Sequence, residues 1–111
     1  MLNELTQKYI EAFDSRDLER CTELFSENFA LEDSVVKRIE GKGNVLKAIK
    51  GIFDSCEKLS FTAKNIYIDN QTTIIEFVLK LDDTILTGTD ILEWEDNKMK
   101  ELRAYLDIPK G

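Results

Sequence analysis

Histidine is absent from the 111-residue sequence, and cysteine and proline are scarce. Without histidine there is no Ser-His-Asp triad, no imidazole proton shuttle and almost no route to a zinc site. The two cysteines, Cys21 and Cys56, are too few for a cysteine metal cluster. We expect both to be reduced thiols buried on helices. With one proline and five glycines, the chain has no stretch that resembles a linker.

Basic residues are outnumbered, 15 against 22 acidic ones, which gives a net charge of −7. This balance argues against nucleic acid and anionic membranes as partners, because both are bound through Lys and Arg. The first five residues have no basic and apolar signal pattern, and no apolar run is long enough to span a membrane. We therefore expect a cytoplasmic, globular protein with one domain, residues 1–111.

Three amphipathic helices are predicted in the first half of the chain. Residues 15–17 end the first helix, and Asp17 can cap the second. Residues 26–28 are expected to end the second helix, and Gly41 and Gly43 precede the third. The apolar stripes consist of Leu2, Leu5, Tyr9, Ile10 and Phe13; of Leu18, Cys21, Leu24 and Phe25; and of Val45 or Leu46, Ile49, Ile52, Phe53 and Cys56.

The second half predicts an antiparallel meander, because its apolar residues alternate with a period of two. A β-bulge is expected between Ala63 and Ile66, where the alternation slips. Helices followed by a meander indicate an α+β domain with the helices on one face of a curved sheet. The predicted strands are 29–31, 59–68, 72–81, 84–94 and 99–106, and the predicted turns are 69–71, 82–83 and 96–97.

Asp90 is the first candidate for chemistry, because it shares a strand face with Leu92 and Trp94. If that face points inward, the carboxyl enters an apolar layer and either finds donors or stays protonated. A neutral aspartic acid in an apolar pocket can donate a hydrogen bond to a developing oxyanion. In the alternative, Thr87 and Thr89 mark the inward face and Asp90 is solvated.

Asp33 and Tyr9 are further candidates, each with an ordinary structural explanation. Asp33 follows the short strand, where it is either a general base facing a pocket or part of an acidic loop. Tyr9 lies on the first apolar stripe, where it either serves a site or is a core residue with a hydrogen-bonded hydroxyl.

Tyr9, Asp33 and Asp90 lie in stretches that resemble a known family. Near the start these stretches are residues 9–14, 17–18, 23–25 and 30–33, and near the end they are residues 89–94 and 102–106. The stretches resemble the nuclear-transport-factor-2-like superfamily, in its SnoaL-like and steroid delta-isomerase-like branch. The resemblance implies a cone-shaped (cystatin-like) α+β fold. Three N-terminal helices would pack on a curved, mainly antiparallel β-sheet.

Within the isomerase branch, the resemblance places the catalytic residues at Asp33, Tyr9 and Asp90. It implies a reaction without cofactor or metal. Asp33 would move a proton α to a carbonyl, while Tyr9 and neutral Asp90 would hydrogen-bond the enolate oxygen.

Three positions depart from the steroid isomerases. Ser34 follows Asp33 where proline is usual, Phe25 replaces a supporting tyrosine, and Ile49 falls near a further pocket tyrosine. Tyr9 would then lack its hydrogen-bonded relay. We therefore expect a carbonyl compound smaller than a steroid.

Apolar side chains are expected either to line a pocket for a small apolar ligand or to fill the core. The resemblance also implies a homodimer formed through the open face of the sheet. The pocket residues are Phe13, Phe25, Phe29, Phe53, Phe61, Phe77, Leu79, Leu92, Trp94 and Tyr105, and the dimer residues are Ile74, Glu76, Val78, Met99, Glu101 and Arg103.

Three functions stay open from the sequence. An isomerase or cyclase acting on a small apolar carbonyl compound needs Tyr9, Asp33 and Asp90 to converge on one cavity. A non-catalytic ligand-binding or accessory module needs only the cavity. An adaptor for protein cargo needs an exposed apolar patch on the outside of the sheet.

Overall fold

The computed structural model describes residues 1–33 and 37–107, so that Ser34 lies outside the described residues. Helices and strands follow one another in an order close to that predicted, with one additional strand. The elements are α1 (Leu2–Asp14), α2 (Leu18–Leu24), β1 (Phe25–Asp33), β2 (Lys37–Glu40), α3 (Lys42–Asp54), β3 (Leu59–Asp69), β4 (Thr72–Leu81), β5 (Thr84–Glu95) and β6 (Lys98–Asp107).

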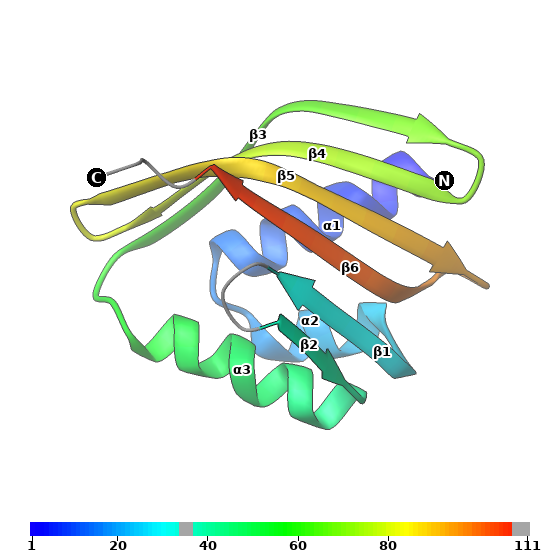
Figure 1. Ribbon diagram of the computed structural model, residues 1–111, viewed down its shortest axis with the longest axis horizontal. Coiled ribbons are helices and arrows are strands. Elements are labelled where there is room, and N and C mark those ends of the chain that lie inside the picture. The colour runs from blue at the N-terminus through cyan, green and yellow to red at the C-terminus, as the bar shows by residue number, and fades with distance from the viewer. Residues whose placement is uncertain (34–36, 108–111) are drawn as a thin grey trace.

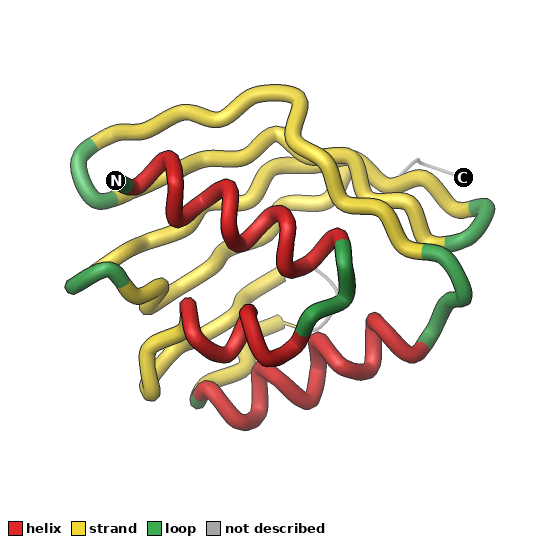
Figure 2. The backbone as a smooth tube through the Cα atoms, turned by 180° about the vertical axis from the view of Figure 1, so that it is seen from behind, coloured by secondary structure: helices red, strands yellow, loops and turns green. Residues whose placement is uncertain are grey.

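Within the described residues, six strands form one sheet in the order β2-β1-β6-β5-β4-β3. Neighbouring strands are antiparallel except β1 and β6, which are parallel. The sheet curves across the molecule (Figure 1), and the three helices lie on one side of it (Figure 2). This is the expected α+β architecture, with helices packed on a curved, mainly antiparallel sheet.

The start of the sheet differs from the sequence prediction. Residues 26–28 do not end α2; they belong to β1, which begins at Phe25 directly after the helix. Phe25 is extended and pairs with Met99 of β6, so a contact far along the chain ends the helix. The prediction also missed β2, which pairs with β1 from residue 37 to residue 40.

Local signals for turns and caps are confirmed. Asp17 caps α2 by accepting a hydrogen bond from the Arg20 N–H at 3.2 Å. The bulge in β3 lies between Ala63 and Asn65. Gly41 precedes α3 with φ of 94°, a conformation that favours glycine, whereas Gly43 lies inside the helix. The hairpin turns hold left-handed residues at Asn70, Asp82, Asp96 and Asn97.

The two cysteines differ in environment. Cys21 is buried on α2, as expected, and burial raises the pKa of its thiol to about 12. Cys56 is half-buried and follows α3 rather than lying on it, because the helix ends at Asp54. Both are free thiols.

The outer face of the sheet carries a charged network. Arg38 pairs with Glu101 at 3.0 Å, and Arg103 pairs with Glu93 at 2.9 Å and with Glu101. Met99, predicted to lie on this face, is fully buried instead. A bulge between the pairs Glu93–Glu101 and Trp94–Met99 turns Met99 inward. None of the described helices has both the length and the apolar character needed to cross a membrane.

A buried polar cluster joins α1 to the sheet. The Thr73 hydroxyl oxygen accepts hydrogen bonds from the Thr6 hydroxyl at 3.0 Å and from the Trp94 indole N–H at 2.9 Å. All three residues are almost fully buried. The cluster therefore fixes the position of α1 over the sheet while satisfying polar groups that water does not reach.

Replacing Thr73 with valine is expected to destabilise the fold. The shape is kept, but the buried Thr6 and Trp94 donors lose their acceptor, and each unsatisfied group costs roughly 1–3 kcal/mol. Urea unfolding followed by Trp94 fluorescence measures the loss. The matched control is Thr62→Val on the exposed surface of β3, expected within about 0.5 kcal/mol of wild type. Equal stability of the two variants would contradict the role of the cluster.

Candidate functional site

Asp33 and Asp90 lie in one row that crosses three strands. Asp33 of β1 pairs with Ala104 of β6, and Ala104 pairs with Asp90 of β5. Paired residues point to the same face of a sheet, so the two carboxyls stand on the helix side with Ala104 between them. Their Cα atoms are two strand spacings apart, about 10 Å.

A cavity of about 170 Å³ lies over this row, between α1, α3 and the sheet. Tyr9, Asp33 and Asp90 all contribute to its wall. The structure thus brings the three proposed catalytic side chains to one cavity. The other lining residues are apolar: Phe13, Phe25, Phe29, Leu31, Ile49, Ile52, Phe61, Phe77, Leu79, Leu81, Leu86, Leu102, Ala104 and Leu106.

Four of the ten predicted lining residues lie elsewhere in the core or outside it. Phe53, Leu92 and Trp94 are buried but do not reach the cavity wall. Phe53 packs edge-on against Phe13, with ring centroids 5.0 Å apart, and Trp94 bonds to Thr73. These three side chains fill the core around the cavity.

Tyr105 was expected in the pocket, and this prediction is wrong. Its side chain is 53% exposed on the outer face of the sheet. Tyr105 pairs with Thr89, while its neighbours Ala104 and Leu106 line the cavity. Alternation from Leu102 to Leu106 therefore sends Tyr105 to the opposite side of the sheet.

The sequence prediction missed the aliphatic side of the cavity. Leu81, Leu86 and Leu106 are half-buried and line it with Leu79 near the β4–β5 hairpin. Ala104 was also missed. The available signal was the alternation of Leu102, Ala104 and Leu106 along β6, which places all three on one face.

Asp90 is 5% exposed, so the alternative of a solvated carboxyl is excluded. Burial, and then the negative charge of Asp33, together raise the pKa of Asp90 to about 8. A carboxyl with this pKa is mainly protonated at pH 7. The group can then donate a hydrogen bond into the cavity.

Tyr9 is buried beside Asp90. Burial, and then the charges of Asp90 and Cys21, raise the pKa of the Tyr9 phenol well above its usual value. The hydroxyl therefore keeps its proton at neutral pH. Phe25 lies near it, with ring centroids 6.5 Å apart, and offers no hydrogen bond to the phenol. Phe25 therefore supplies no hydrogen-bonded relay to the Tyr9 hydroxyl.

Among residues 1–33 and 37–107, no lysine or arginine contributes to the wall of the cavity. The same residues contain no group of three or more acidic or sulfur side chains that could hold a metal ion. The described site consists of two carboxyls and one phenol in an apolar wall.

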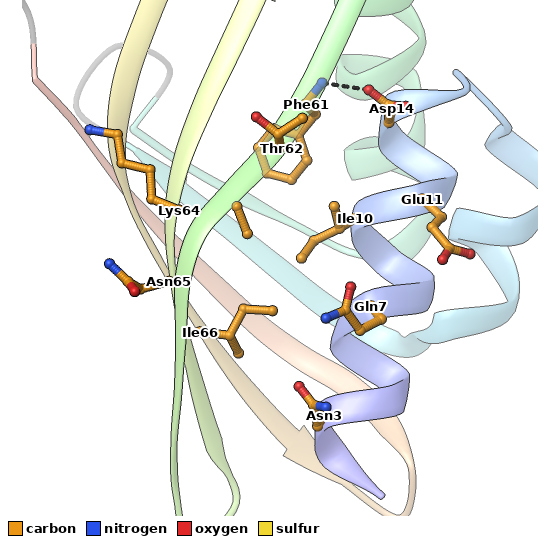
Figure 3. A pocket seen from close by; sticks show the side chains of 11 residues that line it. Asn3, Gln7, Ile10, Glu11, Asp14, Phe61, Thr62, Lys64, Asn65 and Ile66 are labelled. Atoms are coloured by element: carbon orange, nitrogen blue, oxygen red, sulfur yellow. Dashed lines mark hydrogen bonds between the residues drawn. The ribbon is translucent and has the colours of Figure 1, made fainter.

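A second hollow, of about 560 Å³, lies between α1 and β3 and differs in character. Asn3, Gln7 and Lys64 border it (Figure 3). At its upper end, the Asp14 carboxylate accepts the Phe61 N–H at 2.8 Å. This bond satisfies a backbone donor of the edge strand β3 and joins it to α1. We assign the hollow no part in the site, since it contains none of the three converging groups.

Comparison with known proteins agrees with this architecture. The family model for the SnoaL-like domain matches residues 6–102, which is most of the chain. The chain belongs to the SnoaL-like domain family. No curated protein is similar enough to this SnoaL-like chain to give a match.

Solved structures with the same fold include proteins of different activity. A proposed ketosteroid isomerase from Kribbella flavida has 20% identity and a TM-score of 0.86, covering 97% of this SnoaL-like chain and 78% of its own. A proposed isomerase from Bacillus subtilis has 28% identity and a TM-score of 0.78, covering 94% and 84%. An LEH-like epoxide hydrolase from M. tuberculosis has 14% identity and a TM-score of 0.78, covering 94% and 80%. The fold alone does not decide among such activities.

Proposed function

We propose that this SnoaL-like protein is a cofactor-independent isomerase that acts on a small, apolar carbonyl compound. The observation that carries the proposal is the placement of Tyr9, Asp33 and Asp90 on one apolar cavity, with Asp90 mainly protonated. Two of these groups donate hydrogen bonds and the third is a carboxylate. This is the set needed to form and stabilise an enolate.

The proposed reaction moves one proton. The Asp33 carboxylate removes a proton from the carbon next to the carbonyl, and the electrons pass to the carbonyl oxygen. Tyr9 and Asp90 donate hydrogen bonds to that oxygen, and each such donor contributes about 3 kcal/mol to transition-state stabilisation. Asp33 then returns the proton to a different carbon, so the product is an isomer of the substrate.

The volume of the cavity limits the substrate. At about 170 Å³ it is close to cavities of roughly 150 Å³ that hold one benzene molecule. It falls below the roughly 300–1,000 Å³ of pockets for drug-sized ligands. Four fused steroid rings do not fit such a space. A single-ring ketone does.

The test reaction is the conversion of cyclohex-3-enone to cyclohex-2-enone by the wild-type protein. The product is conjugated, so its ultraviolet absorbance reports the rate directly. We expect saturable turnover, and Asp90→Leu is expected to lower the rate about 10²- to 10³-fold because it removes one oxyanion donor.

The competing function is a binding module of the same fold. It predicts no rate above the buffer reaction, together with binding of acetophenone that Asp90→Leu and Tyr9→Phe leave unchanged. That pair of results would overturn the isomerase proposal.

A further inference from the structure

Ala104 occupies the centre of the candidate site. It is the residue of β6 that separates Asp33 from Asp90 in the row across the sheet. β6 itself lies between β1 and β5, so neighbours on both sides fix its backbone. The space above Ala104 is thus bordered by a carboxyl on either side.

The rows before and after Ala104 carry larger side chains. Leu102 and Leu106 are the inward residues of β6 on either side of it, and both line the cavity. The row of Leu106 continues through Gly88 to Phe77. A Cβ on Gly88 would lie 2.9 Å from the Phe77 ring. The ring therefore lies over Gly88 and fills the space that the glycine leaves. Because Ala104 is smaller than Leu102 and Leu106, the cavity wall is recessed at Ala104, between two rows of larger side chains.

We propose that Ala104 sets the size limit of the site, because the reacting atoms of a neutral, single-ring carbonyl compound occupy the space above its methyl group. The placement of these atoms rests on the proposed function, whereas the size limit concerns binding alone. A larger side chain fills the region between the two carboxyls. Glycine at this position deepens the same region.

Charge selects the ligand as well as size. The carboxyls of Asp33 and Asp90 flank the space above Ala104. Among the described residues, no lysine or arginine contributes to the cavity wall. A substrate carboxylate or phosphate would lie beside two carboxyls, and none of the described wall residues is a lysine or arginine that could pair with it. The ligand class is therefore neutral, which agrees with a ketone or an aldehyde.

The experiment measures binding of acetophenone to wild type, Ala104→Val, Ala104→Leu and the control Ala63→Val. We expect Ala104→Val to weaken binding by about tenfold or more and Ala104→Leu to abolish it, on the scale known for added methylenes in apolar pockets. Ala63 is a half-buried alanine of β3 outside the cavity wall, so its variant is expected to stay within about twofold of wild type. Circular dichroism checks that each variant is folded.

Ala104→Gly tests the size limit through a gain in relative affinity, which a misfolded variant would not show. We expect it to raise the affinity for 2-naphthol relative to phenol, because the larger ring system gains the added depth. Unchanged acetophenone binding in Ala104→Leu, or an unchanged preference in Ala104→Gly, would overturn the inference. If binding responds as expected but wild type does not isomerise cyclohex-3-enone, the size limit stands and the proposed function fails. If wild type is active and the variants bind normally, only the size limit fails.

Discussion

Asp33→Asn is expected to lower the rate of cyclohex-3-enone isomerisation by about 10²- to 10⁴-fold, the usual contribution of a positioned general base. Asparagine keeps the shape of the side chain but does not accept the substrate proton as a carboxylate does. The oxyanion donors Tyr9 and Asp90 are untouched by this change. We therefore expect acetophenone to bind with nearly wild-type affinity while turnover is lost.

The matched control for this prediction is Glu32→Gln. Glu32 precedes Asp33 on β1 and points to the outer face, where it pairs with Arg38 at 3.3 Å. The substitution makes the same chemical change on the opposite side of the strand, so the rate should stay within about threefold of wild type. A rate for Asp33→Asn equal to that of the control would remove Asp33 from the reaction.

Most of the fold was predictable because its signals are local. The hairpin turns lie where Asp and Asn cluster, and the bulge of β3 lies where its alternation slips. The pairing of β1 with β6 joins residues about 70 positions apart in the chain, so no short stretch of sequence predicts it. The early start of β1 follows from that pairing, which explains why it was missed. β2 was missed for another reason, because its four residues, Lys37–Glu40, are mostly exposed and show no apolar alternation.

The candidate site was predictable in its polar groups and less so in its walls. Tyr9, Asp33 and Asp90 came from a family resemblance, and the inward direction of Asp90 follows from its alternation with Leu92 and Trp94. The prediction for Tyr105 is wrong because its position between the inward residues Ala104 and Leu106 directs its side chain to the outer face. The volume of the cavity depends on how all surrounding side chains pack together, so no single stretch of sequence contains it.

The buried Asp90 carboxyl lowers the free energy of unfolding at neutral pH. A carboxyl at Asp90 is protonated in the fold at neutral pH but ionised in the unfolded chain, where its usual pKa is 3.8 and not about 8. The unfolded state therefore gains from releasing a proton that the folded state retains. Below about pH 4 both states are protonated and the cost vanishes. Between about pH 4 and pH 8 it grows, and above pH 8 it is constant.

Asp90→Asn is accordingly expected to stabilise the protein at neutral and alkaline pH. The span between the two pKa values corresponds to about 6 kcal/mol over the whole window, and the variant is free of this penalty since its amide does not ionise. The gain relative to wild type should be small near pH 4 and approach its full value near pH 8. Urea unfolding of both proteins at several pH values measures it.

The control for this gain is Asp83→Asn in the exposed turn between β4 and β5, which removes the same charge from the surface. Its stability difference from wild type should vary little with pH. If Asp90→Asn and Asp83→Asn show the same pH dependence, Asp90 is not held protonated in the fold, and the proposed second oxyanion donor is lost with it. A stable but less active Asp90→Asn protein would instead show a site that lowers the stability of the fold to support its reaction.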